Sequence, residues 1–180
     1  MNYYGAKALA RSFRTVRNNT LIIAEEIPED QYNFQLTPDT RTVSQLLSHI
    51  ALTFNFQYYI HAEEVLTTLE GLDFPSLMQR LRAEQEKPRS KDEIIALLKS
   101  GADKWAQWVD ELSEEFLAER VNMPPGAEPA DKSRFEMILS VKEHEMHHRG
   151  QMMLIQRLLG IVPHLTRQMQ ERMAQLKGKK

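Results

Sequence analysis

Residues 141–160 read VKEHEMHHRGQMMLIQRLLG, and their pattern settles most of the architecture. Apolar residues recur there at steps of three and four, which is the spacing of one face of an α-helix. Upstream, Ser133-x-x-Glu136 is a capping box, which satisfies the free N–H groups at a helix start. Downstream, Gly160 is typical of the position just past a helix end. We predict a helix over about residues 133–159 with one buried face: Met137, Val141, His144, His148, Met152, Ile155 and Leu159.

Three other segments repeat this periodicity, over about residues 7–27, 42–62 and 91–117. The second and third begin with capping boxes headed by Thr42 and Ser90. Four long amphipathic helices are typical of a four-helix bundle, in which each helix buries one face against the others. The fold class is therefore predicted to be all-α, a four-helix bundle with additional short helices.

Shorter elements and long connections complete the predicted organisation. Short helices are expected over about residues 75–85 and 164–176, and long polar connections over 28–41 and 118–132. No segment shows the period-two alternation of a strand. The 180 residues suit a single domain. Residues 177–180 are predicted to be a disordered tail.

The composition excludes several classes of protein. The chain contains no cysteine, so disulfides, protein thiolate nucleophiles and cysteine-based metal sites are excluded. Its 23 Lys and Arg residues and 25 Asp and Glu residues leave a formal net charge of −2, which gives no electrostatic reason to expect a nucleic-acid partner. No apolar run approaches the ~20 residues needed to cross a bilayer. We expect a cytoplasmic protein without a membrane partner.

Histidine is the residue type that could hold a metal ion here. His144 and His148 are four residues apart, so they lie one above the other on the buried face of their helix. A buried imidazole without partners costs about 1–3 kcal/mol, whereas a divalent ion takes the lone pair of each neutral ring. His49, in SQLLSHIALTFNF on a second helix, is the candidate third ligand. We predict a three-histidine site with open coordination positions, whereas His147 should lie at the helix flank.

Glu145 admits several interpretations. Residues 144–148 match H-E-x-x-H, in which two histidines bind zinc and the glutamate is the general base of a metalloprotease. That interpretation is disfavoured, because the chain has no predicted strand to pair with an extended peptide. Glu145 remains a weak candidate base, an outer partner of the metal ligands, or a solvated charge.

Other side chains carry weaker signals. Arg149 follows the histidine pair and is interpreted either as a surface charge or as an anion-binding group for a cofactor or substrate. His61 and His164 are predicted to be surface groups. Gly150, inside a helix, predicts a close approach of a neighbouring helix. Several aromatic residues are interpreted first as core, with a minority lining a pocket: Phe54, Phe56, Tyr58, Trp105 and Trp108.

Two blocks of this sequence resemble the DinB family of DinB/YfiT-like proteins. One is TVSQLLSHIA, which contains His49, and the other is HEMHHRGQ, which contains the family pattern H-x-x-x-H followed by Arg-Gly-Gln. The resemblance extends over nearly the whole chain. It implies a divalent metal, usually nickel or zinc, on His49, His144 and His148. It also implies a homodimer.

The resemblance leaves three functions open. Some members of the family are thiol S-transferases that use low-molecular-weight thiols, others are described as metal-dependent hydrolases, and many have no known activity. A bound divalent ion lowers the pKa of a coordinated thiol or water, so either could supply the nucleophile. Our leading hypothesis is a metal-dependent thiol S-transferase that acts on small electrophiles, with the thiol as cosubstrate. The alternatives are a hydrolase that uses metal-bound hydroxide and a non-catalytic metal-binding or stress-response module.

Overall fold

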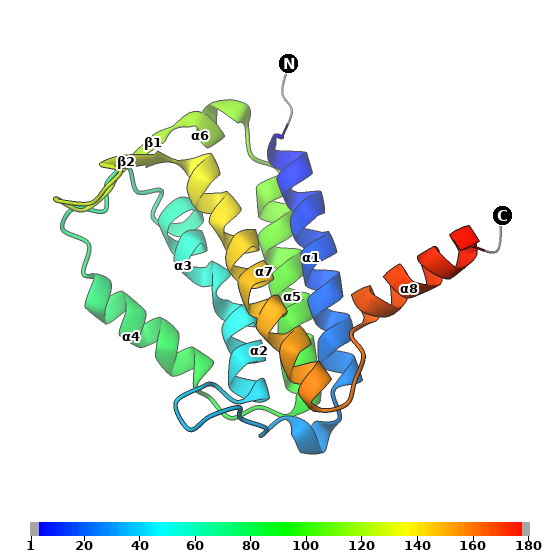
Figure 1. The fold of residues 1–180 in the computed structure, drawn as a ribbon. Helices are drawn as coiled ribbons and strands as arrows, with labels where there is room; N and C mark the ends of the chain where they lie inside the picture. Colours follow the sequence, from blue (N-terminus) through cyan, green and yellow to red (C-terminus); the bar gives the residue numbers. More distant parts are fainter. Residues whose placement is uncertain (1–3, 178–180) are drawn as a thin grey trace.

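Four helical columns lie side by side in the computed structural model, which describes residues 4–177 (Figure 1). They are α1, α2 continued by α3, α5 and α7, and the column of α2 and α3 packs against both α5 and α7. The predicted all-α bundle is confirmed. In chain order the elements are α1 (Ala6–Glu26), the 3₁₀ helix η1 (Glu29–Gln31), α2 (Val43–Leu52), α3 (Phe54–Tyr58), the π-helix η2 (Tyr59–Glu63), α4 (Phe74–Gln85), α5 (Lys91–Asp110), α6 (Glu114–Ala118), β1 (Arg120–Asn122), β2 (Asp131–Ser133), α7 (Arg134–Leu158) and α8 (His164–Lys177).

The predicted capping boxes are all present. Thr42, Ser90 and Ser133 each accept a hydrogen bond from the backbone N–H three residues on, and the Gln or Glu at that position accepts one from the cap residue's N–H. These reciprocal bonds begin α2, α5 and α7 where the sequence predicts. Beyond the end of α7, Gly160 has φ +77°, a conformation that favours glycine.

The second column is not the single helix predicted over 42–62. It changes hydrogen-bonding pattern at Thr53 and again at Tyr59, where the π-helix begins. The wider turn of η2 buries Ile60 and His61 between the bundle and the hairpin end of the molecule. Periodicity did not reveal this change, because the five residues of η2 make about one turn, which is too short to show a period of its own.

The third predicted helix ends earlier than expected, at Asp110 rather than near 117. Ser113 then caps a separate short helix, α6, by accepting a hydrogen bond from Phe116 N–H. After α6, β1 and β2 form an antiparallel two-stranded hairpin that the sequence analysis did not predict. Each strand has three residues, which is too short to show an alternating pattern.

The glycine at which two helices approach closely is Gly101, not Gly150. A Cβ at Gly101 would lie 2.9 Å from Cε1 of Phe54 and 3.1 Å from the carbonyl oxygen of Ala51, so this glycine lets α5 approach α2 and α3 closely. No atom lies within 4 Å of the corresponding position at Gly150. The predicted close approach at Gly150 is therefore wrong.

His61 and His164 are buried, so their predicted surface position is also wrong. Arg134 Nη1 donates to His61 Nδ1 over 2.9 Å, and His61 Nε2 donates to Gln57 Oε1 over 3.0 Å. Burial, together with the charge of Arg134, lowers the pKa of His61 to about 3. His164 Nε2 pairs with Oδ1 of Asn19 over 3.0 Å. Hydrogen bonds to residues distant in sequence, Arg134 and Asn19, allow both histidines to be buried.

Two helices, α4 and α8, lie outside the four columns and differ in how they contact them. α4 lies beside α2, outside the four columns, whereas α8 extends away from them (Figure 1). Lys177, the first residue of the predicted tail, is the last residue of α8, and residues 178–180 lie outside the described part of the chain. Within residues 4–177, no helix is long and apolar enough to cross a membrane.

Candidate metal centre

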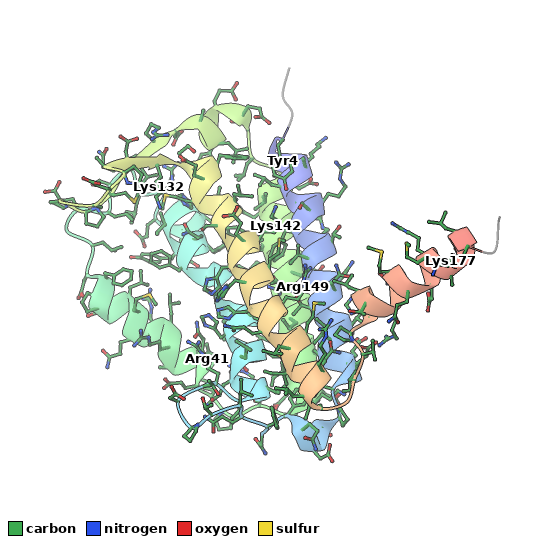
Figure 2. The ribbon with its side chains drawn as sticks, in the orientation of Figure 1. Tyr4, Arg41, Lys132, Lys142, Arg149 and Lys177 are labelled. Atoms are coloured by element: carbon green, nitrogen blue, oxygen red, sulfur yellow. The ribbon has the colours of Figure 1, made fainter. Side chains whose placement is uncertain are left out.

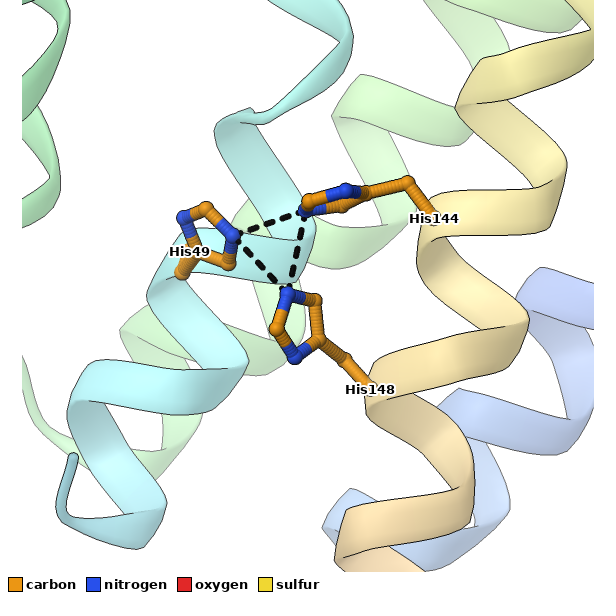
Figure 3. A group of neighbouring side chains, drawn as sticks. All are labelled: His49, His144 and His148. Atoms are coloured by element: carbon orange, nitrogen blue, oxygen red, sulfur yellow. Dashed lines mark hydrogen bonds between the residues drawn. The ribbon is translucent and has the colours of Figure 1, made fainter. Parts of the chain in front are cut away.

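Three histidines meet between α2 and α7, as predicted (Figure 3). The Nε2 atom of His49 lies 2.8 Å from Nε2 of His144 and 3.1 Å from Nε2 of His148. The Nε2 atoms of His144 and His148 are 3.0 Å apart. In the described part of the chain, this is the only group of three or more His, Asp or Glu side chains arranged to hold a metal ion.

Local sequence positions these rings before any ligand is considered. His144 and His148 occupy successive turns of α7, which aligns them on one face. His49 lies near the end of α2, whose start is set by the capping box at Thr42. Packing of α2 against α7 then brings the three rings together. His147 is exposed, as predicted.

Two glutamines determine which nitrogen of His49 and of His148 faces the centre. His49 Nδ1 donates to Gln85 Oε1 over 2.9 Å, and His148 Nδ1 donates to Gln151 Oε1 over 2.7 Å. Because a neutral imidazole carries one N–H, the Nε2 atoms of His49 and His148 present lone pairs to each other. His144 has at most one Nε2–H to share between them. A cation resolves this repulsion.

The donor set fits a divalent transition metal. Imidazole nitrogen suits nickel and zinc, and ~2.0–2.1 Å metal–nitrogen bonds can join one ion to three atoms about 3 Å apart. Burial, together with the charge of Arg41, lowers the pKa of His49 to about 4. Burial also lowers the pKa values of His144 and His148. The three rings are therefore neutral near pH 7, as metal coordination requires.

The centre opens onto a pocket of about 350 Å³ between α2, α3, α4 and α7. His49 and His144 form part of its wall, so a small molecule in this space would lie next to a metal ion held by the histidines. A second hollow adjoins His148 and Gln151. The remaining wall of the first pocket consists of Arg41, Leu52, Thr53, Phe56, Gln57, Phe74, Met78, Leu81, Arg82, Gln85, Ser140 and Val141.

Phe56 is the predicted aromatic residue that lines this pocket, whereas Phe54 and Trp105 are buried in the core. Tyr58 and Trp108 are partly buried and pack against the same core. The expectation of mostly core aromatics with a minority in a pocket is therefore confirmed for these residues.

Glu145 belongs to a different cluster on α7. Its carboxylate accepts hydrogen bonds from Arg17 Nε at 2.9 and 3.1 Å and from Thr20 Oγ1 at 2.8 Å. Arg17 and Glu145 are fully buried, so the interpretation of Glu145 as a solvated charge is wrong. The carboxylate is directed towards α1 rather than to the histidines, and the structure does not place it to act as their base.

Arg149 does not line the histidine pocket, where the anion-binding interpretation would place it, but lies on the part of α7 that faces α1 and α8 (Figure 2). Its charge contributes to the lowered pKa of His164. The arginine beside the histidines is Arg41, which lies at the end of the polar connection before α2 (Figure 2). Sequence reasoning missed Arg41 and Gln85, because both reach the centre from outside α2 and α7.

Solved structures with similar folds include DinB-like proteins. A DinB-like protein from Bacillus subtilis matches with a TM-score of 0.62 and 20% identity over 84% of this chain and 92% of that one. An uncharacterised protein from Clostridium difficile 630 matches with a TM-score of 0.65 and 14% identity over 87% of this chain and 98% of that one.

A third structure, described as sibling lethal factor precursor DfsB, matches with a TM-score of 0.64 and 14% identity over 89% of this chain and 100% of that one. At these identities the likeness concerns the fold. No curated protein matches the chain. The sequence profile of the DinB superfamily matches residues 12–152, and the chain therefore belongs to the DinB superfamily.

Proposed function

We propose that this protein is a metal-dependent thiol S-transferase that acts on small electrophiles. The observation that carries the proposal is the set of three neutral imidazoles, whose Nε2 atoms converge on one point beside a pocket. His49, His144 and His148 would hold nickel or zinc. When bound by neutral ligands alone, such an ion retains its full charge and lowers the pKa of a coordinated thiol.

The reaction needs a thiol from outside, because the chain has no cysteine. The cosubstrate thiol releases its proton to solvent, its sulfur bonds to the electrophilic carbon, and the leaving group departs with the electron pair of the broken bond. Gln85 and Gln151 hold the imidazole rings in orientation. The apolar pocket wall, which includes Phe56 and Met78, positions the electrophile and excludes water.

Metal analysis combined with a thiol-consumption assay tests the proposal. We expect one nickel or zinc ion per chain and metal-dependent loss of thiol with chlorodinitrobenzene or monochlorobimane as the electrophile. His148→Ala should abolish both, whereas His147→Ala, an exposed neighbour, should change neither. Ester or amide cleavage without thiol would instead support the hydrolase. Bound metal with neither activity would support the non-catalytic module, and a chain that binds no metal would contradict all three.

We also propose that the protein forms a homodimer through the side that carries α8. Met169, Met173 and Leu176 are exposed at helical spacing on α8. Exposed apolar stripes of this kind are typical of association surfaces. Light scattering on the eluting protein should give twice the chain mass of 21.0 kDa. A monomer at micromolar concentration would contradict this.

A further inference from the structure

We propose that the substrate held beside the histidines carries a carboxylate and an apolar group, with Arg41 and Arg82 binding the carboxylate. In identifying this molecule as a substrate, the inference rests on the proposed function, but the binding itself does not. Arg41 and Arg82 line the histidine pocket and also share the wall of an adjoining hollow with Gln85. A guanidinium presents paired N–H groups that match the two oxygens of a carboxylate.

The two arginines lack the carboxylate partners that other arginines of this chain have. Arg89 pairs with Glu84 at 2.7 Å and Arg134 pairs with Glu119 at 2.8 Å. Within residues 4–177, neither Arg41 nor Arg82 forms an ion pair, although Glu86 lines the adjoining hollow with them. Their charges are therefore available to a ligand.

The glutamines of the pocket also present donors. His49 donates to Oε1 of Gln85, and His61 donates to Oε1 of Gln57 because Arg134 occupies the other nitrogen of that ring. Each amide oxygen is thus engaged on the protein side, and the NH₂ group remains for the pocket.

The wall of the pocket contains no Asp or Glu. Arginine and amide donors, together with a divalent ion when it is bound, form a positive surface that favours an anion with acceptor oxygens.

The other side of the pocket favours an apolar group. Phe56 and Phe74 meet edge to face with ring centroids 5.8 Å apart, and Met78 and Leu81 continue the wall. Phe74 remains 51% exposed, which leaves a large aromatic surface for a ligand to cover. A volume of about 350 Å³ is within the ordinary range of small-molecule sites. The pocket therefore suits an aryl or alkyl carboxylate rather than a small inorganic anion.

Calorimetry with a matched pair of probes tests the proposal without relying on activity. 3-Phenylpropionate and 3-phenylpropanamide have nearly the same shape and differ in charge. At pH 7.5 the carboxylate should bind about tenfold more tightly than the amide, to both the metal-free and the zinc-loaded protein. The metal-free measurement separates arginine recognition from coordination of the carboxylate to zinc. Equal affinities for the two probes, or no binding of the carboxylate to either form, would overturn the proposal.

Charge-neutral variants identify the residues responsible. Arg41→Gln and Arg82→Gln should each weaken binding of the carboxylate several-fold, and the double variant should bind both probes about equally. Arg149→Gln, which removes the same charge from a different side of α7, is the matched control and should leave both affinities unchanged. A circular dichroism spectrum of each variant confirms folding. The same loss in Arg149→Gln would indicate a general charge effect and would also overturn the proposal.

A steady-state comparison shows which reactant carries the carboxylate. 3-Mercaptopropionate is compared with 2-mercaptoethanol as the thiol, and 4-(chloromethyl)benzoate with 4-(chloromethyl)benzamide as the electrophile. In each transfer the sulfur–carbon bond replaces the carbon–chlorine bond, with release of chloride and of the thiol proton. The double arginine variant should raise KM about tenfold for the charged reactant alone. If no transfer occurs but the calorimetric preference persists, the proposed function fails and the carboxylate site stands.

Discussion

α7 carries two polar clusters whose chemistry contrasts sharply. On the side towards α1, Glu145 accepts bonds from Arg17 and Thr20, and Arg17 also donates to the backbone oxygens of Leu98 and Ile50. On the side towards α2, three histidine nitrogens face one another and open onto a pocket. The first cluster satisfies its charges within the protein, so it holds helices together. The second leaves lone pairs that need a ligand.

The largest expected effect concerns the cluster of Glu145, Arg17 and Thr20, whose charges and hydrogen bonds are paired within the protein. Glu145→Ala leaves the Arg17 charge buried without its partner and should lower the free energy of unfolding by about 3–5 kcal/mol in urea denaturation. Glu143→Ala, at an exposed position on the same helix, is the control and should have little effect. The double change Arg17→Met, Glu145→Leu should recover much of the loss. If Glu145→Ala behaved like the control, the buried pair would not hold α1 to α7.

The histidine cluster should respond to metal instead. Zinc at 100 times its Kd should raise the free energy of unfolding of the wild-type protein by about 2.7 kcal/mol. His148→Ala should remove this gain, because it deletes one of three ligands, yet change the metal-free protein much less than Glu145→Ala does. Thermal unfolding with and without zinc measures both the zinc-dependent gain in stability and the change in the metal-free protein. A zinc-dependent rise that survived His148→Ala would show that the ion binds elsewhere.

A third buried polar group, His61, should make the protein less stable in acid, because both of its ring nitrogens are hydrogen-bonded in the neutral form. Its pKa is about 3 in the folded protein, because of burial and the charge of Arg134, against about 6.5 when unfolded. The stabilising contribution is complete above pH 6.5. As the pH falls below that value, the unfolded chain takes up the proton first, and the free energy of unfolding falls by about 1.4 kcal/mol per pH unit.

The matched variant for this titration is His61→Gln, which retains hydrogen-bonding groups but does not titrate. Urea denaturation of both proteins between pH 7 and pH 5 should show the steeper acid dependence in the wild type. Parallel curves would mean that His61 has the same pKa in the folded and the unfolded protein.

The smallest expected effect concerns the glycine beside the histidines. Gly150→Ala should stabilise the protein by up to about 1 kcal/mol, because the position is exposed and no atom lies within 4 Å of the added Cβ. Gly101→Ala should destabilise it, since the added Cβ would meet Phe54 and the Ala51 carbonyl. Thermal unfolding of the two variants compares them directly. Loss of stability in Gly150→Ala would point to a role for this glycine in the metal-binding segment.

Local pattern was sufficient for most of the fold and for the three clustered histidines. The capping boxes at Thr42, Ser90 and Ser133 act over three residues, and helical period acts over four, so both can be recognised without knowledge of the partner helices. The same reasoning identified His144 and His148 as a pair, and the apolar face of a second helix identified His49 as the candidate third member of the cluster.

The partners of charged and titratable groups depended on the packing of distant segments. Arg17 and Glu145 are 128 residues apart in sequence, and His49 and Gln85 are 36 apart. No periodicity distinguishes a glutamate that will meet a buried arginine from one that will face water. For this reason Glu145 and His61 were misplaced, and Arg41 was missed at the pocket.

The helices, the residues at which they start and the three inward-facing imidazoles could therefore be predicted from the sequence. Each of them depends on interactions within one or two helical turns. The tertiary structure assigned Glu145 to Arg17 and Arg41 to the pocket, since these pairings exist only after α1, α4 and α7 have packed around α2 and α5. Burial makes the Arg17–Glu145 pair a structural bond, whereas Arg41 is exposed and remains accessible at the pocket.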